Sequence, residues 1–218
     1  MKAARFFILA SILFYGCATH QLYDTAQFRH REVQYKEITL DKEGLTPEQI
    51  KAISSTKPPR LFPVDISIIL IKDSYIDSEV ENAFTYNIVK ELSKSKKIKR
   101  ITLIPDFLIP NPIGFNSIQE LGVRSLSEYV LIFDLKGREI FNWTLIIETK
   151  FEIKSSINFI LVDSYTTAIL TSDKLYSTQE YKEKIFRLKE RREAQEIIFS
   201  EQGKLLAEKI DELFSGEK

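Results

Sequence analysis

The chain has 218 residues, of which 44% are hydrophobic and 28% charged, and its 31 basic and 31 acidic residues cancel to a formal net charge of zero. This composition is typical of a globular protein, and it lacks the basic excess that nucleic-acid binding requires. The only histidines are His20 and His30, and the only cysteine is Cys17. Beyond residue 30 the chain therefore has no Ser-His-Asp or Cys-His catalytic group and no Cys/His zinc site. We expect no catalytic residues, no metal and no cofactor, although carboxylate-only or Ser-Lys chemistry stays open without a positive signal.

The first residues are typical of an export signal. Lys2 and Arg5 precede an apolar run over residues 6–15, and Gly16 stands directly before Cys17. This run is too short for a membrane-spanning helix, which needs about 20 apolar residues, whereas a basic start, a short apolar core and a small residue describe a cleaved signal. The pattern resembles a bacterial lipoprotein signal, which implies that residues 1–16 are removed and that Cys17 carries lipid. The alternative is an ordinary cleaved signal in which Cys17 is incidental.

Residues 17–63 are predicted to form the lipidated N-terminus and a tether. Within them, Thr46 can cap a helix, Pro47 suits the first helical position, and Gln49 completes a capping box. We therefore expect a short helix over residues 47–53. The tether is either a spacer between the membrane and the domain or an arm that lies on its own domain.

The domain itself is assigned to residues 64–218, and its first half alternates strands with helices. A β-branched run predicts a strand buried on both faces, and apolar residues at helical spacing after Asp77 or Ser78 predict a helix. The next helix is expected to begin at Asn116 or Ser117 and to carry Ile118, Leu121 and Leu126 on one side. The expected elements are strand 65–71, helix 78–92, strand 101–104 and this second helix.

Two segments of this half leave alternatives open. The basic cluster over residues 94–100 is either a surface for an anionic partner or, as we favour, a solvated helix end. The proline-rich, apolar segment 105–115 is either an exposed contact surface or, as we favour, a connection packed over the core.

The second half is predicted to be an antiparallel meander followed by a helix. Residues 129–135 form the most apolar strand, and Asp134 near its end either lies beside a pocket or faces solvent. Residues 143–154 alternate strictly and are interpreted as one strand with a wet face. The remaining expectations are turns at 136–138, 154–156 and 163–167, strands at 157–162 and 169–176, and a helix from a cap at Ser177 to about residue 214. The charged stretch 187–193 of this helix is either a face for a partner or for lipid headgroups or, as we favour, a solvated stretch.

These elements predict an α/β fold with an α+β tendency. The expected order is β-α-β-α, then an antiparallel meander, then a long C-terminal helix, in a single mixed sheet with helices packed on it. The opening β-α-β unit is expected to cross over with the right-handed sense.

Residues 118–135 and 161–170 resemble a theme in which a helix leads into a strand and a later strand carries Asp, Thr and an apolar pair. That theme belongs to the α/β lipoprotein domain of curli-secretion lipoproteins, activators of penicillin-binding proteins and the amino-terminal domain of TolB. Ala168 replaces the family's glycine here. The resemblance implies no catalytic residues and two behaviours: a regulator that docks on an envelope enzyme, or a ring that inserts hairpins to form a secretion channel, for which residues 143–162 would be the hairpin.

The sequence therefore predicts a lipid-anchored cell-envelope protein, held by lipid (palmitate) on Cys17, that acts as a non-enzymatic protein-binding or regulatory module. Ala18 rather than aspartate follows Cys17, which favours the outer membrane, facing the periplasm. The expected partners are the membrane and an envelope protein, without nucleic acid, and the chain is compatible with an oligomer. The alternatives are a subunit of a ring-forming outer-membrane channel, a periplasmic lipoprotein that binds a small ligand, and an enzyme that uses Asp134.

Overall fold

The computed structural model describes residues 36, 38–40, 45–56, 62–144, 148–183 and 188–215. For residues 140–151, 181–191 and 215, only the backbone is described where it falls in these ranges. Five strands form one mixed sheet in the order β2-β1-β3-β4-β5. Strand β1 is parallel to β2 and β3, whereas β3-β4 and β4-β5 are antiparallel. The predicted fold class is therefore confirmed. The strands are β1 (Val64–Lys72), β2 (Ile98–Leu103), β3 (Tyr129–Thr144), β4 (Glu148–Asp163) and β5 (Ile169–Glu183).

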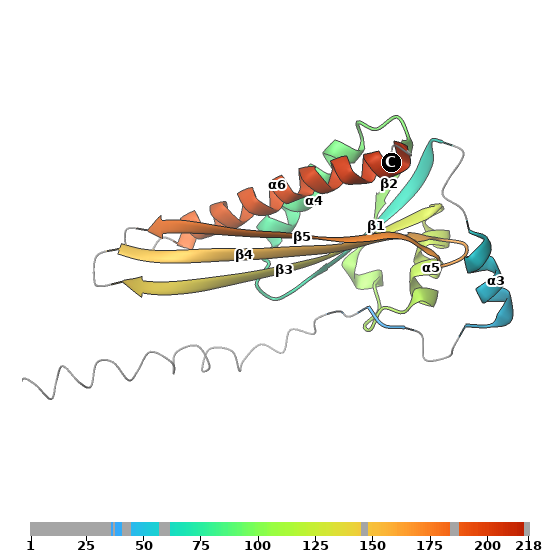
Figure 1. Ribbon diagram of the computed structural model, residues 1–218, viewed down its shortest axis with the longest axis horizontal. Coiled ribbons are helices and arrows are strands. Elements are labelled where there is room, and N and C mark those ends of the chain that lie inside the picture. Colours follow the sequence, from blue (N-terminus) through green and yellow to red (C-terminus); the bar gives the residue numbers. More distant parts are fainter. Residues whose placement is uncertain are drawn as a thin grey trace, which may run out of the picture. The chain divides into compact units, whose positions relative to one another are not determined.

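Helices cover both faces of the sheet around β1 (Figure 1). Helices α4 (Ser78–Leu92) and α6 (Leu188–Ser215) pack against each other and share one core with the sheet, in which Phe84 and Phe133 meet edge to face with ring centroids 5.2 Å apart. Helix α5 (Phe115–Arg124) covers the other face through a second core that contains Ile69, Ile118 and Val130. Because β1 is covered on both sides, its sequence is an almost unbroken apolar run.

Three elements form where local signals placed them. Strand β1 extends the predicted strand by one residue at each end, and α4 has the predicted bounds, with the Asp77 carboxylate accepting from the backbone N–H of Val80 at 3.0 Å. Helix α3 (Pro47–Ser55) has the complete capping box between Thr46 and Gln49. All three are therefore confirmed, and α3 runs two residues further than expected.

The meander has three long strands rather than four short ones. The turns predicted at 136–138 and 154–156 are wrong, because Gly137 and Ser155 pair with each other inside the β3-β4 ladder. The interpretation of residues 143–154 as one strand is also wrong: the ladder closes at Thr144 opposite Glu148, so the alternation belongs to two paired strands. Gly137 lies inside the strand rather than in a turn, and a Cβ there would lie 2.8 Å from the flexible end of Ile76, at Cδ1.

The long C-terminal helix is confirmed, but its predicted start is wrong. Residues 177–180 do not cap a helix, because they pair with β4 as part of β5, and the ladder continues to Glu183 opposite Thr149. The helix begins at Leu188 instead. Its charged first part contacts the domain, since Arg192 forms ion pairs with Asp77 at 3.5 Å and Glu79 at 3.1 Å.

Two boundaries in the first half also differ from expectation. Helix α5 is not capped by Asn116 or Ser117; it begins at Phe115 with Gly114 as N-cap and no side-chain cap bond. Leu126 lies beyond this helix, with φ of 56° and 74% exposure, so it does not extend the apolar side. Strand β2 begins at Ile98, three residues earlier than predicted.

Candidate binding surface

Asp134, the one carboxylate weighed as a possible pocket residue, lies within β3, not at the exit of a strand as expected. Its carboxylate accepts a hydrogen bond from Asn158 Nδ2 at 3.0 Å and pairs with Lys136 Nζ at 3.1 Å. All three side chains belong to one face of the meander, because the register places Asp134 opposite Asn158. The carboxylate, whose side chain is 15% exposed, is thus held by neighbours on the sheet.

Asp73, just after β1, is a second carboxylate beside Asp134 and was missed by sequence reasoning. Burial raises the pKa of Asp73, and the negative charge of Asp134 raises it further, whereas hydrogen bonds from the backbone N–H groups of Gly137 and Tyr75 lower it. The bond from Gly137, at 2.9 Å, ties the β1–α4 loop to β3, and the bond from Tyr75, at 3.0 Å, lies within that loop. The Asp73 carboxylate thus has a structural role in the loop after β1.

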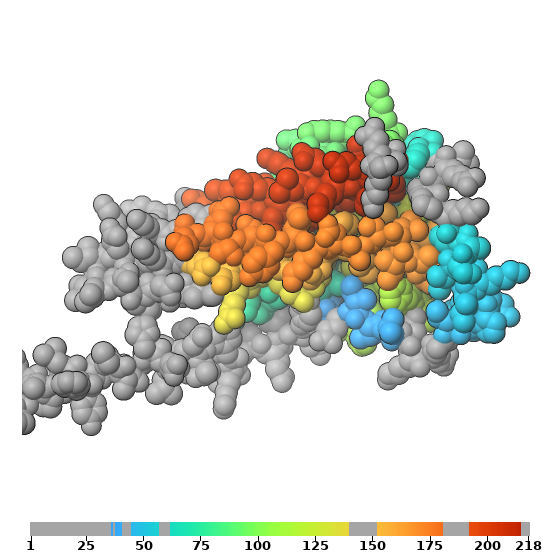
Figure 2. Space-filling model, viewed as in Figure 1, coloured from blue at the N-terminus to red at the C-terminus, as the bar shows by residue number. Residues whose placement is uncertain are grey.

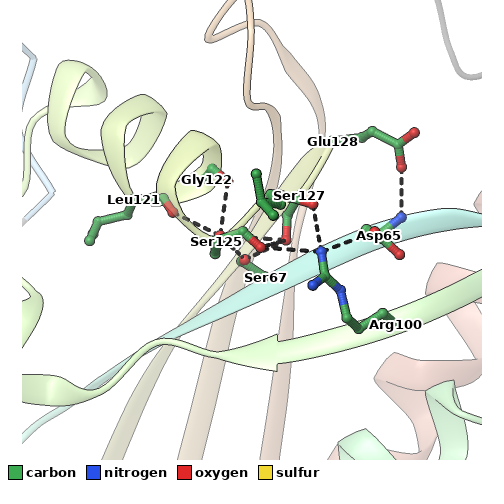
Figure 3. A network of polar contacts seen from close by, with 9 residues as sticks. Asp65, Ser67, Arg100, Leu121, Gly122, Ser125, Ser127 and Glu128 are labelled. Carbon is green, nitrogen blue, oxygen red and sulfur yellow. Dashed lines mark hydrogen bonds and ion pairs between the residues drawn. The ribbon is translucent and has the colours of Figure 1, made fainter.

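A buried hydroxyl cluster lies at the opposite end of β1 (Figure 3). Ser67, fully buried in β1, contacts Ser125 Oγ at 2.5 Å and donates to Ser127 Oγ at 2.7 Å. Ser125 in turn donates to backbone carbonyls at the end of α5. Among the described contacts of these hydroxyls there is no lysine, histidine or carboxylate to act as a base, and their hydrogen bonds satisfy the buried polar groups of the cluster.

Charged residues close the same end of the sheet (Figure 3). Arg100 pairs with Asp65 Oδ2 at 3.0 Å and donates to the Leu126 carbonyl at 2.7 Å. The Glu128 carboxylate accepts from the Asp65 backbone N–H at 2.6 Å. Arg100 therefore fixes the turn after α5, and the interpretation of residues 94–100 as a helix end is wrong for Lys99 and Arg100, which lie on β2.

A polar surface on a regular element is the face of the meander turned away from α6. Beyond Leu135, β3 no longer pairs with β1, and α5 contacts only the part of this face near Val130 and Ile132. No helix among the described residues lies over the remainder, and β5 is exposed along the sheet edge (Figures 1 and 2). We call it the open face. Its residues are Asp134, Lys136 and Arg138 on β3, Glu152, Lys154, Ser156 and Asn158 on β4, and Lys174, Tyr176, Thr178 and Glu180 on β5.

The open face mixes both signs of charge with one exposed aromatic ring. Lys136 and Arg138 are exposed, Lys154 lies 3.5 Å from Glu152, and Lys174 Nζ lies 5.9 Å from the centre of the Tyr176 ring. Arginine and tyrosine are enriched in protein interfaces. Period-two alternation could have revealed this face, but only with the correct strand boundaries.

The proline-rich segment 105–115 is both packed and exposed. Ile109 and Ile113 are buried, as the favoured interpretation requires, whereas Phe107 and Leu108 are 84% and 52% exposed on the short helix η2 (Asp106–Leu108).

Parts of the predicted tether contact the domain. Thr39 N–H donates to the Ile113 carbonyl at 2.9 Å, and Thr56 donates to Thr166 Oγ1 at 2.8 Å.

Cys17, His20 and His30 lie outside the residues that the structure describes. Within the described residues, no three His, Cys, Asp or Glu side chains are grouped as a metal site requires. None of the described helices is long and apolar enough to cross a membrane.

Comparison with known proteins gives only distant similarities. No family model and no curated protein matches the sequence. Solved structures to which the chain is similar include a minor lipoprotein from Acinetobacter baumannii, at 13% identity over 68% of this chain and 93% of that chain, with a TM-score of 0.39. The C-terminal domain of LpoB from Salmonella enterica is 11% identical over 60% of this chain and 95% of that domain, with a TM-score of 0.37. PelC from Paraburkholderia phytofirmans, solved as a dodecamer, is 12% identical over 70% and 94%, with a TM-score of 0.38.

Proposed function

We propose that this protein is a lipid-anchored protein of the cell envelope whose α/β domain binds another envelope protein without catalysis. Lipid on Cys17 would anchor the protein to the outer membrane, on the side that faces the periplasm. Residues 17–63 would connect this anchor to a domain over residues 64–218. The support is the export-signal pattern before Cys17 and the structural roles found for the polar clusters around Asp73, Asp134 and Ser67.

The observation that carries the binding proposal is the open face. No described helix lies over this face, and it presents side chains at fixed spacing because every strand of the meander is held in register by its neighbour. Its charges are arranged as cross-strand rows, such as Arg138 with Lys154 and Thr178. A rigid array of this kind can recognise a complementary protein surface without paying to order itself.

The test is purification of the full-length, lipidated protein from its envelope, with chemical cross-linking before detergent extraction. We expect one envelope protein to co-purify with the parent chain, and its recovery to fall by about tenfold when Arg138→Glu and Lys174→Glu reverse charges on the open face. Lys96→Glu with Lys99→Glu makes the same change of charge at exposed positions outside this face and serves as the matched control. Equal recovery with both double variants would contradict the proposal.

The anchor is tested separately in the same cells. Cys17→Ala should move the protein from the detergent-requiring fraction to the soluble fraction, because the acyl chains are the proposed hold on the bilayer. If Cys17→Ala and the parent chain fractionate identically, the lipid anchor is wrong, whatever the open face binds.

One observation favours a second candidate, a subunit of a ring-forming channel. Strands β3 and β4 have 16 residues each, more than the roughly 9–11 residues that a strand needs to span a membrane. Against this, α6 covers the apolar face of the meander through Ile153 and Ile198, so a channel would require α6 to leave. The mass of the detergent complex separates the two candidates, since a large homo-oligomer favours the channel and a one-to-one complex favours the binding module.

A further inference from the structure

The tip formed by Phe107 and Leu108 is a fixed apolar projection. Helix η2 places both side chains outward, between Pro105 and Pro110, which restrict the backbone on either side. Leu108 N–H donates to the Pro105 carbonyl at 3.0 Å, and Ile109 N–H donates to the Asp106 carbonyl at 3.1 Å. The exposed rings and methyl groups are therefore presented by an ordered turn.

The base of the tip is anchored in the core. Directly after the tip, Ile109 is buried, and Ile113 is fully buried with Ile69 and Ile118 in the core beneath α5. Phe107 is 84% exposed, so the described part of the chain gives its ring little burial. Its burial requires something outside the domain.

The segment that leads from the N-terminus attaches at this same place (Figure 1). Lys36 Nζ donates to the Asp106 carboxylate at 2.6 Å and to the Asp106 carbonyl at 2.7 Å. Ile38 bridges to Ile113, and Leu40, which follows, is 82% exposed. The chain arriving from Cys17 thus makes its first described contact beside Phe107.

The chain between Cys17 and Lys36 limits how far the tip can lie from the proposed lipid anchor. Eighteen residues, 18–35, separate Cys17 from Lys36, and they span at most about 60 Å when fully extended. A domain attached to the bilayer through Lys36 has Phe107 among its residues nearest to that attachment point. The only carboxylate on η2, Asp106, is paired with Lys36, which lowers the cost of bringing it to a membrane surface.

We propose that Phe107 and Leu108, with Leu40, insert into the interfacial layer of the membrane to which Cys17 anchors the protein, and so orient the domain. This inference rests on the proposed lipid anchor. It adds a second membrane contact made by side chains, in the manner of peripheral proteins that combine a lipid with apolar residues. The acyl chains hold the protein on the membrane, and the tip selects which side of the domain faces it.

A tryptophan placed at the tip reports on insertion. In the lipidated full chain carrying Trp143→Phe, which removes the only native tryptophan, Phe107→Trp is compared with Tyr86→Trp, a matched control at an aromatic position on α4 that is 64% exposed. Both proteins are reconstituted into vesicles of phosphatidylethanolamine and phosphatidylglycerol with brominated acyl chains. We expect a blue-shifted emission and at least about threefold stronger quenching for Phe107→Trp than for the control.

Each outcome decides one point. Equal, weak quenching at both positions in vesicle-bound protein overturns the tip proposal while leaving the anchor intact. If instead neither protein stays on vesicles and Cys17→Ala fractionates like the parent chain, the anchor itself has failed. A blue shift of Phe107→Trp that appears only when a purified envelope protein is added would also overturn the proposal, because the tip would then bind protein.

Discussion

Gly122 offers the sharpest test of how α5 packs on the sheet. This residue is buried on α5, and a Cβ added there would lie 2.5 Å from Ser164 Oγ, 2.8 Å from Val130 Cγ2 and 2.9 Å from Ser164 Cβ. All three distances are shorter than packed carbon atoms adopt. Gly122→Ala therefore pushes α5 away from β3 and from the turn after β4.

The expected loss follows from two opposing effects. Alanine favours a helix over glycine by about 1 kcal/mol, whereas an extra methyl group in a packed core costs about 1–3 kcal/mol. Contacts with both Val130 and Ser164 place the cost at the upper end, so the net loss is about 2 kcal/mol in the free energy of unfolding. For a chain of this length we expect Tm to fall by about 4–8 °C.

Urea unfolding followed by circular dichroism measures this loss. Gly137→Ala is the comparison, because its Cβ would meet only the flexible end of Ile76, at 2.8 Å, and should cost less. Adding Ser164→Ala removes the nearest atom and should return about 1 kcal/mol to Gly122→Ala. Unchanged or increased stability of Gly122→Ala would show that α5 does not approach the sheet as closely as described.

Three further outcomes test the core, the half-buried carboxylate of Asp73 and the short helix α3. Phe84→Ala should cost about 3–5 kcal/mol in urea unfolding, because the fully buried ring packs on Phe133; a loss below about 1 kcal/mol would contradict this packing. Because the pKa of Asp73 is raised in the folded state, its contribution to stability is present below the unfolded value of 3.8 and falls as the pH rises through the folded value. The stability deficit of Asp73→Asn should thus be larger at pH 3.5 than at pH 6, and a deficit that grows with pH would refute the assignment. Thr46→Ala should cost about 1 kcal/mol locally, seen as faster amide exchange in α3, with global stability unchanged because α3 has no buried residues.

Elements whose signals are adjacent in sequence were predictable. Helix α4 begins directly after Asp77, and the cap of α3 needs only Thr46, Pro47 and Gln49. Strand β1 is mostly apolar because helices cover both faces of the sheet there. A strand with this composition can be recognised from its own sequence. In each case the deciding interactions lie within a few residues.

The long strands of the meander could not be predicted in this way. Gly137 and Ser155 are residues typical of turns, yet both lie within the β3-β4 ladder. Ser155 also pairs with β5 on its other side, and the loop before α4 packs against Gly137. Turn propensity is a local effect, whereas strand continuation here depends on pairing between β3, β4 and β5. The same error hid the open face, because its residues share a face only when both strands run through the expected turns.

The segment 105–115 shows why a choice between exposed and packed was too simple. The backbone turns at η2, so Phe107 and Leu108 point away from the core to which Ile109 and Ile113 belong. Composition alone gives all four the same apolar character. Their division into anchors and tip depends on the direction of one short helix.

The two proposed surfaces lie on the same face of the sheet, and this limits the partner. Ile109 and Ile113 pack on the α5 side through Ile69 and Ile71, and the open face continues that side along β3 and β4 beyond Ile132. A domain that rests on Phe107 therefore turns the open face toward the membrane rather than toward the distant periplasm. The partner is then expected to be a protein at the membrane surface, and it should remain in the membrane fraction when Cys17→Ala releases this chain. A partner that is itself soluble would mean that the tip and the open face are not used together.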